Sequence, residues 1–218
     1  MVIKCREERR KSMDGSKPLL FIDFEFSMPD GNSGYKGFYA EIIEAGLVFS
    51  KNGKVEQEFS SFVTPVKGKR LTERCKSFLG ITQAQVDQGI SFSKLIEALN
   101  RLDSPKKVVT WGNMDMKVLR MNCEKNRCAF PFENDEFIDL SMEYKKFFGD
   151  RNQTGLWKAV EEYGKKGTGQ HHRALDDALT TMKIYKLIEK DKKYLEKPNP
   201  TTIGDRVDFS KLLSKFAT

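Results

Sequence analysis

Residues 19–26 read LLFIDFEF, an apolar run that two carboxylates, Asp23 and Glu25, interrupt. The run contains no glycine or proline and is apolar at most positions, which predicts a central strand of a sheet. Residues two apart share one face of a strand, so both carboxylates point the same way. Two acids placed in this way repel each other unless a cation lies between them. The alternative is a half-exposed strand whose polar face is simply hydrated.

Two more carboxylates stand where helices are expected to begin. Asp115 follows an expected strand at Lys107–Trp111 and opens an expected helix at Met114–Lys125. Asp177 lies in the first turn of an expected helix at Ala174–Lys190. An acid in a first helical turn complements the helix dipole, so either residue alone is more simply explained as a helix-start residue. Together with the two acids of the first strand, however, these residues can converge on one point.

The only two histidines of the chain, His171 and His172, lie just before the last expected helix. Two pairings place a histidine five residues before an aspartate: His171 with Asp176, or His172 with Asp177. Helical spacing weakly favours the second pairing, because Asp177 falls on the more apolar side of the helix. An imidazole titrates near neutral pH and can therefore accept a proton from an attacking water.

These residue types indicate a particular chemistry. Carboxylate oxygens are the ligands that Mg²⁺ and Mn²⁺ prefer. Two such ions about 3.5–4 Å apart bind both the attacking and the leaving oxygen of a phosphodiester. The sequence therefore predicts phosphodiester hydrolysis with two divalent ions and with His172 as the general base. The four predicted metal ligands are Asp23, Glu25, Asp115 and Asp177.

The order of the expected elements predicts the fold class. Besides the strand at residues 19–26, strands are expected at Glu41–Ser50, Lys54–Thr64, Lys107–Trp111 and Phe137–Leu140, and helices at Leu71–Ser77, Gln83–Asp87, Phe92–Leu102, Met114–Lys125, Gly155–Tyr163 and Ala174–Lys190. The pair Asn52–Gly53 is a strong two-residue hairpin turn between the second and third strands. This order predicts an α/β protein with a five-stranded mixed sheet flanked by helices. The ribonuclease H-like fold is the natural candidate.

Length and composition agree with a single globular domain. At 218 residues, with 39% hydrophobic and 32% charged residues, the chain can bury a substantial core. We expect a charged N-terminal extension at residues 1–17, one domain at residues 18–190 and a C-terminal tail at residues 191–218. No apolar run reaches the ~20 residues of a membrane span. The basic N-terminus also lacks the apolar core of a secretory signal, so a cytoplasmic protein without membrane contact is expected.

The net charge indicates a class of partner, and the cysteine content bears on disulfides and zinc binding. The formal net charge of +7 favours a polyanionic partner without identifying one. Four cysteines without CxxC spacing argue against a disulfide framework. A zinc site of Cys123 and Cys128 with the two histidines is an alternative, but the spacing matches no common zinc pattern and free thiols are expected.

The combination of Asp23-x-Glu25, Asp115, and His172 with Asp177 resembles the DEDD exonuclease superfamily in its histidine branch, which includes proofreading exonucleases and ribonuclease T. A closer similarity is to the RNAi-regulating and histone-mRNA 3′ exonucleases. The residues that carry this similarity are Glu41–Glu44, Cys75, Leu79–Thr82, Val86–Asp87 and Gln153–Leu156. The stretches Phe21–Met28, Thr110–Met116 and His171–Ala178 also resemble bacterial KapD-type proteins, which are described as inhibitors of the kinase pathway to sporulation.

The resemblance implies a ribonuclease H-like fold, two Mg²⁺ or Mn²⁺ ions and the pairing of His172 with Asp177. It also implies hydrolysis at single-stranded 3′ ends, of RNA more than of DNA, without an obligate protein partner. Some members of the family stack an aromatic residue on the terminal base just before the mid-chain aspartate. Met114 holds that position here, so Met114 and Phe26 are the residues expected to contact the substrate. Two alternatives stay open: an exonuclease that acts on DNA, and a regulatory binding protein of a sporulation pathway.

Overall fold

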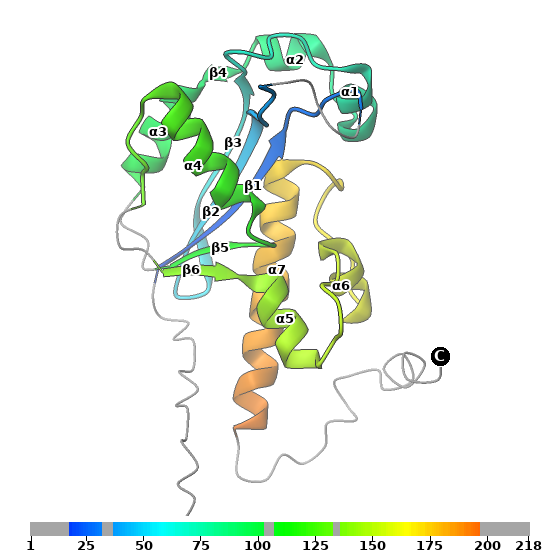
Figure 1. Ribbon diagram of the computed structural model, residues 1–218. Coiled ribbons are helices and arrows are strands. Elements are labelled where there is room, and N and C mark those ends of the chain that lie inside the picture. The colour runs from blue at the N-terminus through cyan, green and yellow to red at the C-terminus, as the bar shows by residue number, and fades with distance from the viewer. Residues whose placement is uncertain (1–17, 32–36, 103–106, 133–135, 197–218) are drawn as a thin grey trace, which may run out of the picture.

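The protein has a mixed sheet covered by helices on both faces, as the computed structural model of residues 18–31, 37–102, 107–132 and 136–196 shows (Figure 1). The strands are β1 Leu19–Phe26, β2 Ile42–Lys51, β3 Lys54–Thr64, β4 Ile90–Ser91, β5 Lys107–Thr110 and β6 Glu136–Asp139. The helices are α1 Glu73–Leu79, α2 Gln83–Asp87, α3 Phe92–Arg101, α4 Met114–Asn126, α5 Leu140–Phe148, α6 Leu156–Glu162 and α7 Ala174–Leu195. The predicted α/β class is therefore confirmed.

The sheet has the strand order β4-β3-β2-β1-β5-β6, with β1 near its centre. β1 pairs antiparallel with β2 and parallel with β5. The predicted turn between β2 and β3 is confirmed, since Asn52 and Gly53 have φ values of 52° and 73°, the left-handed conformation that a tight hairpin requires. The prediction of five strands was wrong by one. The additional strand, β4, is a two-residue pairing with β3, too short to produce an alternating pattern in the sequence.

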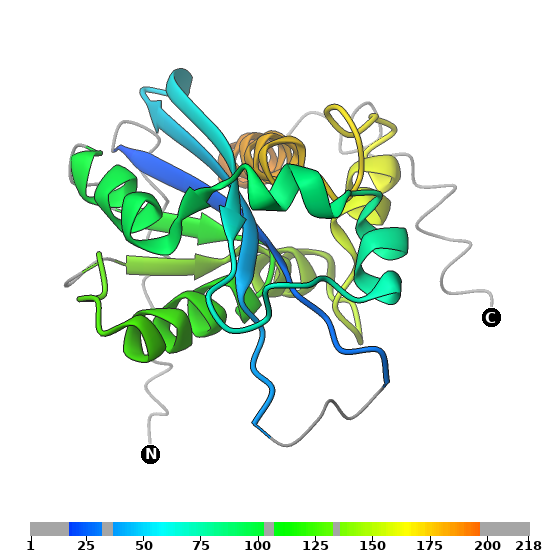
Figure 2. The same ribbon diagram turned by 90° about the horizontal axis from the view of Figure 1, so that it is seen from above.

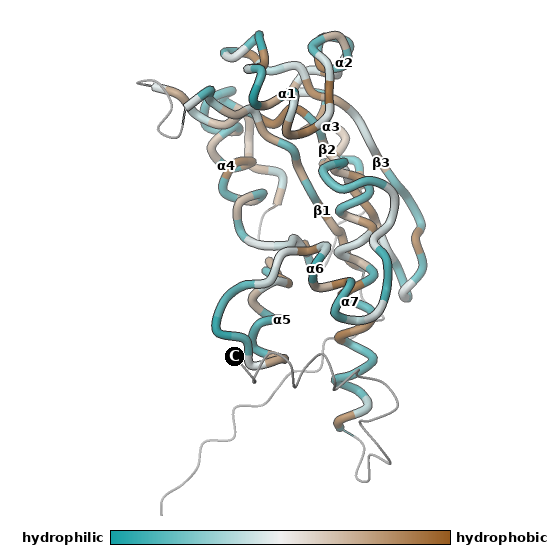
Figure 3. The backbone as a smooth tube through the Cα atoms, turned by 90° about the vertical axis from the view of Figure 1, so that its right-hand side faces the viewer, coloured by the Kyte–Doolittle hydropathy of each residue, from teal (hydrophilic) through white to brown (hydrophobic). Residues whose placement is uncertain are grey.

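The alternating side chains of β1 divide the core into two layers. Leu20, Ile22 and Phe24 pack with residues of α3 and α4. Leu19 and Phe21 pack on the opposite face with residues of α5, α6 and α7. From above, α7 and α4 lie on opposite sides of the strands (Figure 2), and the hydrophobic colour follows much of β1 (Figure 3). Asp23 and Glu25 have the same parity as Phe21, so they face the layer that contains α7.

Helices α5 and α7 show the largest differences from the predicted helices. Helix α5 was not predicted, and Leu140 begins this helix instead of ending a strand, because the side chain of Asp139 accepts a hydrogen bond of 3.2 Å from the amide of Met142 and caps it. Helix α7 continues to Leu195, beyond the predicted end at Lys190 and into the predicted tail. The predicted extension at 1–17 and the tail from 197 onward lie outside the described residues. None of the described helices is long and apolar enough to span a membrane.

Candidate active site

Asp115 accepts a hydrogen bond from the edge of β1 at a point where β5 no longer pairs with this strand. Strand β5 pairs with β1 only from Leu19 to Phe21. Further along, the amide N–H of Phe24 donates a hydrogen bond of 3.0 Å to Oδ1 of Asp115, in the first turn of α4. A buried N–H needs an acceptor, so this bond both satisfies the strand edge and holds Asp115 beside Asp23 and Glu25.

Three of the four predicted ligands form a compact cluster. Asp23, Glu25 and Asp177 each offer a carboxylate oxygen, and these oxygens lie within 4.8 Å of one another. Glu25, Asp115 and Asp177 are buried, with exposed fractions of 8%, 5% and 5%. Asp115 is not one of this close set, yet its charge is the largest neighbouring contribution that raises the pKa of Asp23. The structure therefore brings all four carboxylates together from β1, α4 and α7.

The cluster is electrostatically unfavourable without a cation. Burial, together with the charges of Asp177 and Glu44, raises the pKa of Glu25 to about 8. Burial raises the pKa of Asp115 to about 7, although the amide of Phe24 stabilises its charged form. Burial raises the pKa of Asp23 well above its usual value, and the charges of the neighbouring carboxylates raise it further. Such shifts occur where like charges share a low-dielectric site, and they are typical of functional sites.

Strand β2 determines where the first turn of α7 lies. A Cβ atom on Gly46 would be 2.1 Å from the carbonyl carbon of Ala174, so only glycine allows α7 to approach the sheet this closely. Gly46 is the partner of Asp23 in the β1·β2 pairing. One pleat further, the guanidinium of Arg173 forms an ion pair of 3.1 Å with the buried carboxylate of Glu44, which is the partner of Glu25. The start of α7 is thus fixed directly above the carboxylates of β1.

Asp176 and Asp177 have different roles in the structure. The amide of Gln170 donates a hydrogen bond of 2.8 Å to Oδ2 of Asp176, which holds the loop before α7. The amide of His172 donates a hydrogen bond of 3.1 Å to Oδ2 of Asp177. Only Asp177 belongs to the carboxylate cluster with Asp23 and Glu25. The geometry thus matches the pairing of His172 with Asp177, one of the two that the sequence left open.

Rings from three parts of the chain form a continuous series beside the cluster, and it was not predicted from the sequence. Phe78 lies 4.5 Å from His172, His172 stacks on His171 at 3.8 Å, and His171 lies 5.1 Å from Trp157, all between ring centroids. The indole Nε1 of Trp157 donates a hydrogen bond of 2.5 Å to Oδ1 of Asp177. Burial and the neighbouring His171 lower the pKa of His172, which favours its neutral form. Only contacts between distant segments reveal this series.

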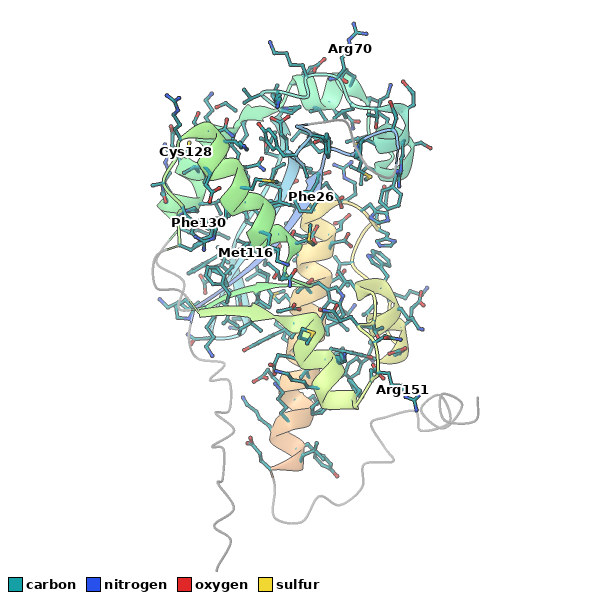
Figure 4. All side chains as sticks on the ribbon, viewed as in Figure 1. Phe26, Arg70, Met116, Cys128, Phe130 and Arg151 are labelled. Atoms are coloured by element: carbon teal, nitrogen blue, oxygen red, sulfur yellow. The ribbon has the colours of Figure 1, made fainter. Side chains whose placement is uncertain are left out.

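The two residues expected to contact substrate are placed differently. Met114 is 55% exposed at the start of α4. Phe26 is partly buried and packs against the core layer of α3 and α4, and Figure 4 shows it in the middle of the molecule. The predicted free thiols Cys123 and Cys128 are unpaired. Among the described residues, neither thiol joins the histidines in a group that could hold a metal ion.

Comparison with known proteins agrees with this geometry. The exonuclease family model of the ribonuclease T type matches residues 20–185. The probable 3′-5′ exonuclease KapD of Bacillus subtilis (strain 168) is 59% identical over 199 residues, which cover 90% of this chain and 97% of that protein. The human ERI1 exoribonuclease 2 is 31% identical over 79% of this chain, but the match spans only 28% of that longer protein.

A solved nuclease structure is also similar to this chain. The nuclease domain of 3′hExo, a DEDDh family member bound to rAMP, superposes with a TM-score of 0.71 at 28% identity, over 81% of this chain and 93% of that chain. The sheet, the carboxylate cluster and the family match all indicate one kind of protein. The chain belongs to the exonuclease family in its DEDDh branch, with a ribonuclease H-like fold, and is a 3′→5′ exonuclease.

Proposed function

We propose that the protein removes nucleotides from the 3′ ends of single-stranded nucleic acid, RNA in preference to DNA, with two Mg²⁺ or Mn²⁺ ions. The observation that carries the proposal is the cluster of Asp23, Glu25 and Asp177, whose oxygens lie within 4.8 Å of one another. In this proposal Asp115, held beside the cluster by the amide of Phe24, is the fourth ligand.

The donor set fits hard divalent cations. All four side chains offer oxygen, which Mg²⁺ and Mn²⁺ prefer over sulfur or imidazole ligands. Burial is the main cause of the raised pKa values of Glu25 and Asp115, so holding these carboxylates in their charged form costs free energy, which bound positive charge would offset. The membership of the exonuclease family implies divalent ions; that there are two is part of the proposal. When bound, such ions supply charge stabilisation for the phosphodiester and lower the pKa of a bound water.

His172 is the proposed general base. One nitrogen of its ring lies within 4.8 Å of an oxygen of Asp177, so the imidazole stands at the cluster. The lowered pKa keeps this ring neutral, and therefore able to accept a proton, at pH 7. His171 lies within the same distance of Asp177 but is exposed, and it stacks on His172 from outside. We assign the proton transfer to His172 and a supporting role to His171.

The preference for RNA is supported by the relatives. ERI1 exoribonuclease 2 and the 3′-5′ exoribonuclease 1 of rat, the latter 31% identical over 76% of this chain, are both named as ribonucleases. A solved 3′-exonuclease that recognises the histone mRNA stem-loop at its 3′ end has a TM-score of 0.70 at 27% identity. Regulation of sporulation is a further part of the proposal, and it rests on the resemblance to KapD-type proteins. No protein partner is required in this account, and we expect a cytoplasmic protein.

The test is digestion of 5′-labelled single-stranded RNA and DNA of one sequence by the purified chain, with Mn²⁺ or with EDTA. We expect a ladder of products that shorten by one nucleotide, faster for RNA, and no products in EDTA. Faster digestion of DNA would favour the DNA-directed alternative. Binding without cleavage of either strand under all metal conditions would favour the regulatory binding protein.

A further inference from the structure

We propose that Trp157 is a positioning residue of the metal centre, which holds the carboxylate of Asp177 in the orientation that binds the ion. The proposal rests on the proposed metal-dependent function and adds a residue to the four carboxylates and the histidine. Trp157 lies in the first turn of α6, and its indole Nε1 donates a hydrogen bond of 2.5 Å to Oδ1 of Asp177, 20 residues further along the chain in α7. A hydrogen bond to a charged carboxylate is roughly twice as strong as one between neutral groups.

Two N–H groups fix the two oxygens of the Asp177 carboxylate. Oδ1 accepts the indole N–H of Trp157, and Oδ2 accepts the main-chain N–H of His172 at 3.1 Å. These two bonds oppose rotation of the carboxylate about its Cβ–Cγ bond. A carboxylate oxygen has two lone pairs, so each oxygen keeps one with which it can bind a cation. Because Asp177 is only 5% exposed, solvent water does not compete freely with these two donors.

Helix α6 holds the indole at a fixed place beside α7. The buried residues Leu156, Ala159 and Val160 of α6 pack in the same core layer as Ala178 and Ile184 of α7, and Figure 1 shows the two helices side by side. The indole itself is half-buried and packs against this layer. A side chain that two packed helices hold in place can orient a metal ligand more precisely than a side chain on a loop.

The loop before α7 restricts the indole further. A Cβ atom on Gly167 would be 2.6 Å from Cζ3 of Trp157, so only glycine allows the loop backbone to lie this close to the ring. The amide of Thr168 donates a hydrogen bond of 2.8 Å to Oγ1 of Thr180, which ties the loop to α7. The ring of His171 lies 5.1 Å from the indole. These contacts keep the indole N–H directed at Asp177.

The second tryptophan of the chain provides a matched comparison. The sequence contains two, and the indole Nε1 of Trp111 donates a hydrogen bond of 3.0 Å to the main-chain oxygen of Thr154. Both indoles make one such bond, and both pack against the core layer of α5, α6 and α7. Only the bond from Trp157 ends on a carboxylate of the cluster. A donor that orients a metal ligand typically contributes about 10–100-fold to metal affinity.

The experiment measures the binding of Mn²⁺ to the full chain without nucleic acid, by calorimetric titration. Trp157→Phe keeps an aromatic ring and removes the N–H donor, so it should raise the Kd for Mn²⁺ by about 10–100-fold. Trp111→Phe also loses an indole hydrogen bond and should keep the wild-type Kd. Benzothienylalanine at position 157 has the shape of tryptophan without the N–H group, and it should reproduce the loss. At saturating Mn²⁺, Trp157→Phe should recover most of the wild-type cleavage rate, because the indole orients a ligand and does not itself transfer a proton.

Fluorescence tests the same contact by a second route. In the Trp111→Phe variant, Trp157 is the only tryptophan of the chain. The paramagnetic Mn²⁺ ion should quench its emission on binding to the carboxylate cluster, and an excess of diamagnetic Mg²⁺ should restore the emission. Emission that Mn²⁺ leaves unchanged, at concentrations where calorimetry detects binding, would place the ion away from Asp177 and would overturn the proposal.

Two results of the titration would also overturn the proposal. An unchanged Kd in Trp157→Phe would show that the indole N–H does not position Asp177. Equal losses in Trp157→Phe and Trp111→Phe would show a general effect of the core layer, and urea unfolding of both variants measures that effect directly. A wild type that binds no Mn²⁺ would refute the metal site and this proposal together. A wild type that binds Mn²⁺ but cleaves no nucleic acid would refute only the exonuclease function.

Discussion

The main-chain N–H of His172 donates a hydrogen bond of 3.1 Å to Oδ2 of Asp177, five residues further along the chain. His172 adopts a φ of 64°, an uncommon conformation for a residue with a side chain. The bond therefore ties the proposed general base to a proposed metal ligand through the backbone. A strained backbone conformation such as the positive φ of His172 persists where the surrounding structure holds it, and it is frequent at functional sites.

The first prediction separates the two histidines. His172→Ala should lower kcat by about 10²–10⁴-fold, the usual contribution of a general base. His171→Ala should lower kcat much less, because this exposed ring stacks on His172 from outside and is not the proposed base. The backbone bond to Asp177 is kept in both variants, so metal affinity should change little. Single-turnover cleavage and metal titration of the two variants give the comparison. A larger loss for His171→Ala would reverse the assignment.

The second prediction separates the neighbouring aspartates. Asp177→Asn should abolish cleavage and weaken metal binding, because Asp177 belongs to the carboxylate cluster. Asp176→Asn should keep most of the activity, because its carboxylate accepts the amide of Gln170 and holds the loop. A weakened hydrogen bond of this kind costs about 1 kcal/mol of stability. Calorimetric titration with Mn²⁺ measures both variants. Retained metal binding by Asp177→Asn would contradict the ligand set.

The third prediction concerns the close approach of α7 to the sheet. Gly46→Ala should destabilise the protein by about 1–3 kcal/mol or more, since the added methyl group would overlap the backbone of Ala174. The displaced helix should also lower the affinity for metal. Gly155→Ala is the control, because nothing lies within 4 Å of a Cβ atom there. Urea unfolding of both variants gives the difference. Equal stability of the two would mean that α7 does not need this contact.

The fourth prediction follows from the raised pKa values of Glu25, about 8, and Asp115, about 7, in the metal-free protein. Above the ordinary carboxylate pKa of about 4, the folded state holds more protons than the unfolded state. The free energy of unfolding should therefore fall as pH rises from about 5 to about 8. Melting temperatures in EDTA test this, and Glu25→Gln should reduce the slope. An unchanged slope in that variant would assign the pH dependence to other groups.

Local patterns in the sequence were sufficient for most of the fold. The run at residues 19–26 has the apolar character of a central strand. The pair Asn52–Gly53 strongly favours a two-residue hairpin turn, because both residues readily adopt a positive φ. Helix α5 was missed although Leu140, Tyr144 and Phe148 recur at helical spacing after the cap Asp139. Strand β4 could not be predicted, because two residues carry no periodicity.

The site was predictable only as far as residue type and order allow. The two carboxylates of β1 share a face by geometry alone, and the structure places Asp115 and Asp177 beside them. The contact between the rings of Phe78 and His172 could not be predicted, because it joins segments 94 residues apart (172 − 78). The same holds for Glu44 and Arg173, whose ion pair joins β2 to the start of α7.

The most direct measurement compares the wild type with Asp23→Asn on 5′-labelled single-stranded RNA and on a circular RNA of the same sequence, with Mn²⁺ and with EDTA. Asp23 is the residue to replace, because a carboxylate oxygen of Asp23 lies within 4.8 Å of carboxylate oxygens of Glu25 and Asp177. We predict that the wild type shortens the linear RNA one nucleotide at a time from its 3′ end and only with Mn²⁺. The circular RNA should stay intact, and Asp23→Asn should cleave neither while it remains folded. Cleavage of the circle, or undiminished digestion by Asp23→Asn or in EDTA, would contradict a metal-dependent 3′→5′ exonuclease at this cluster.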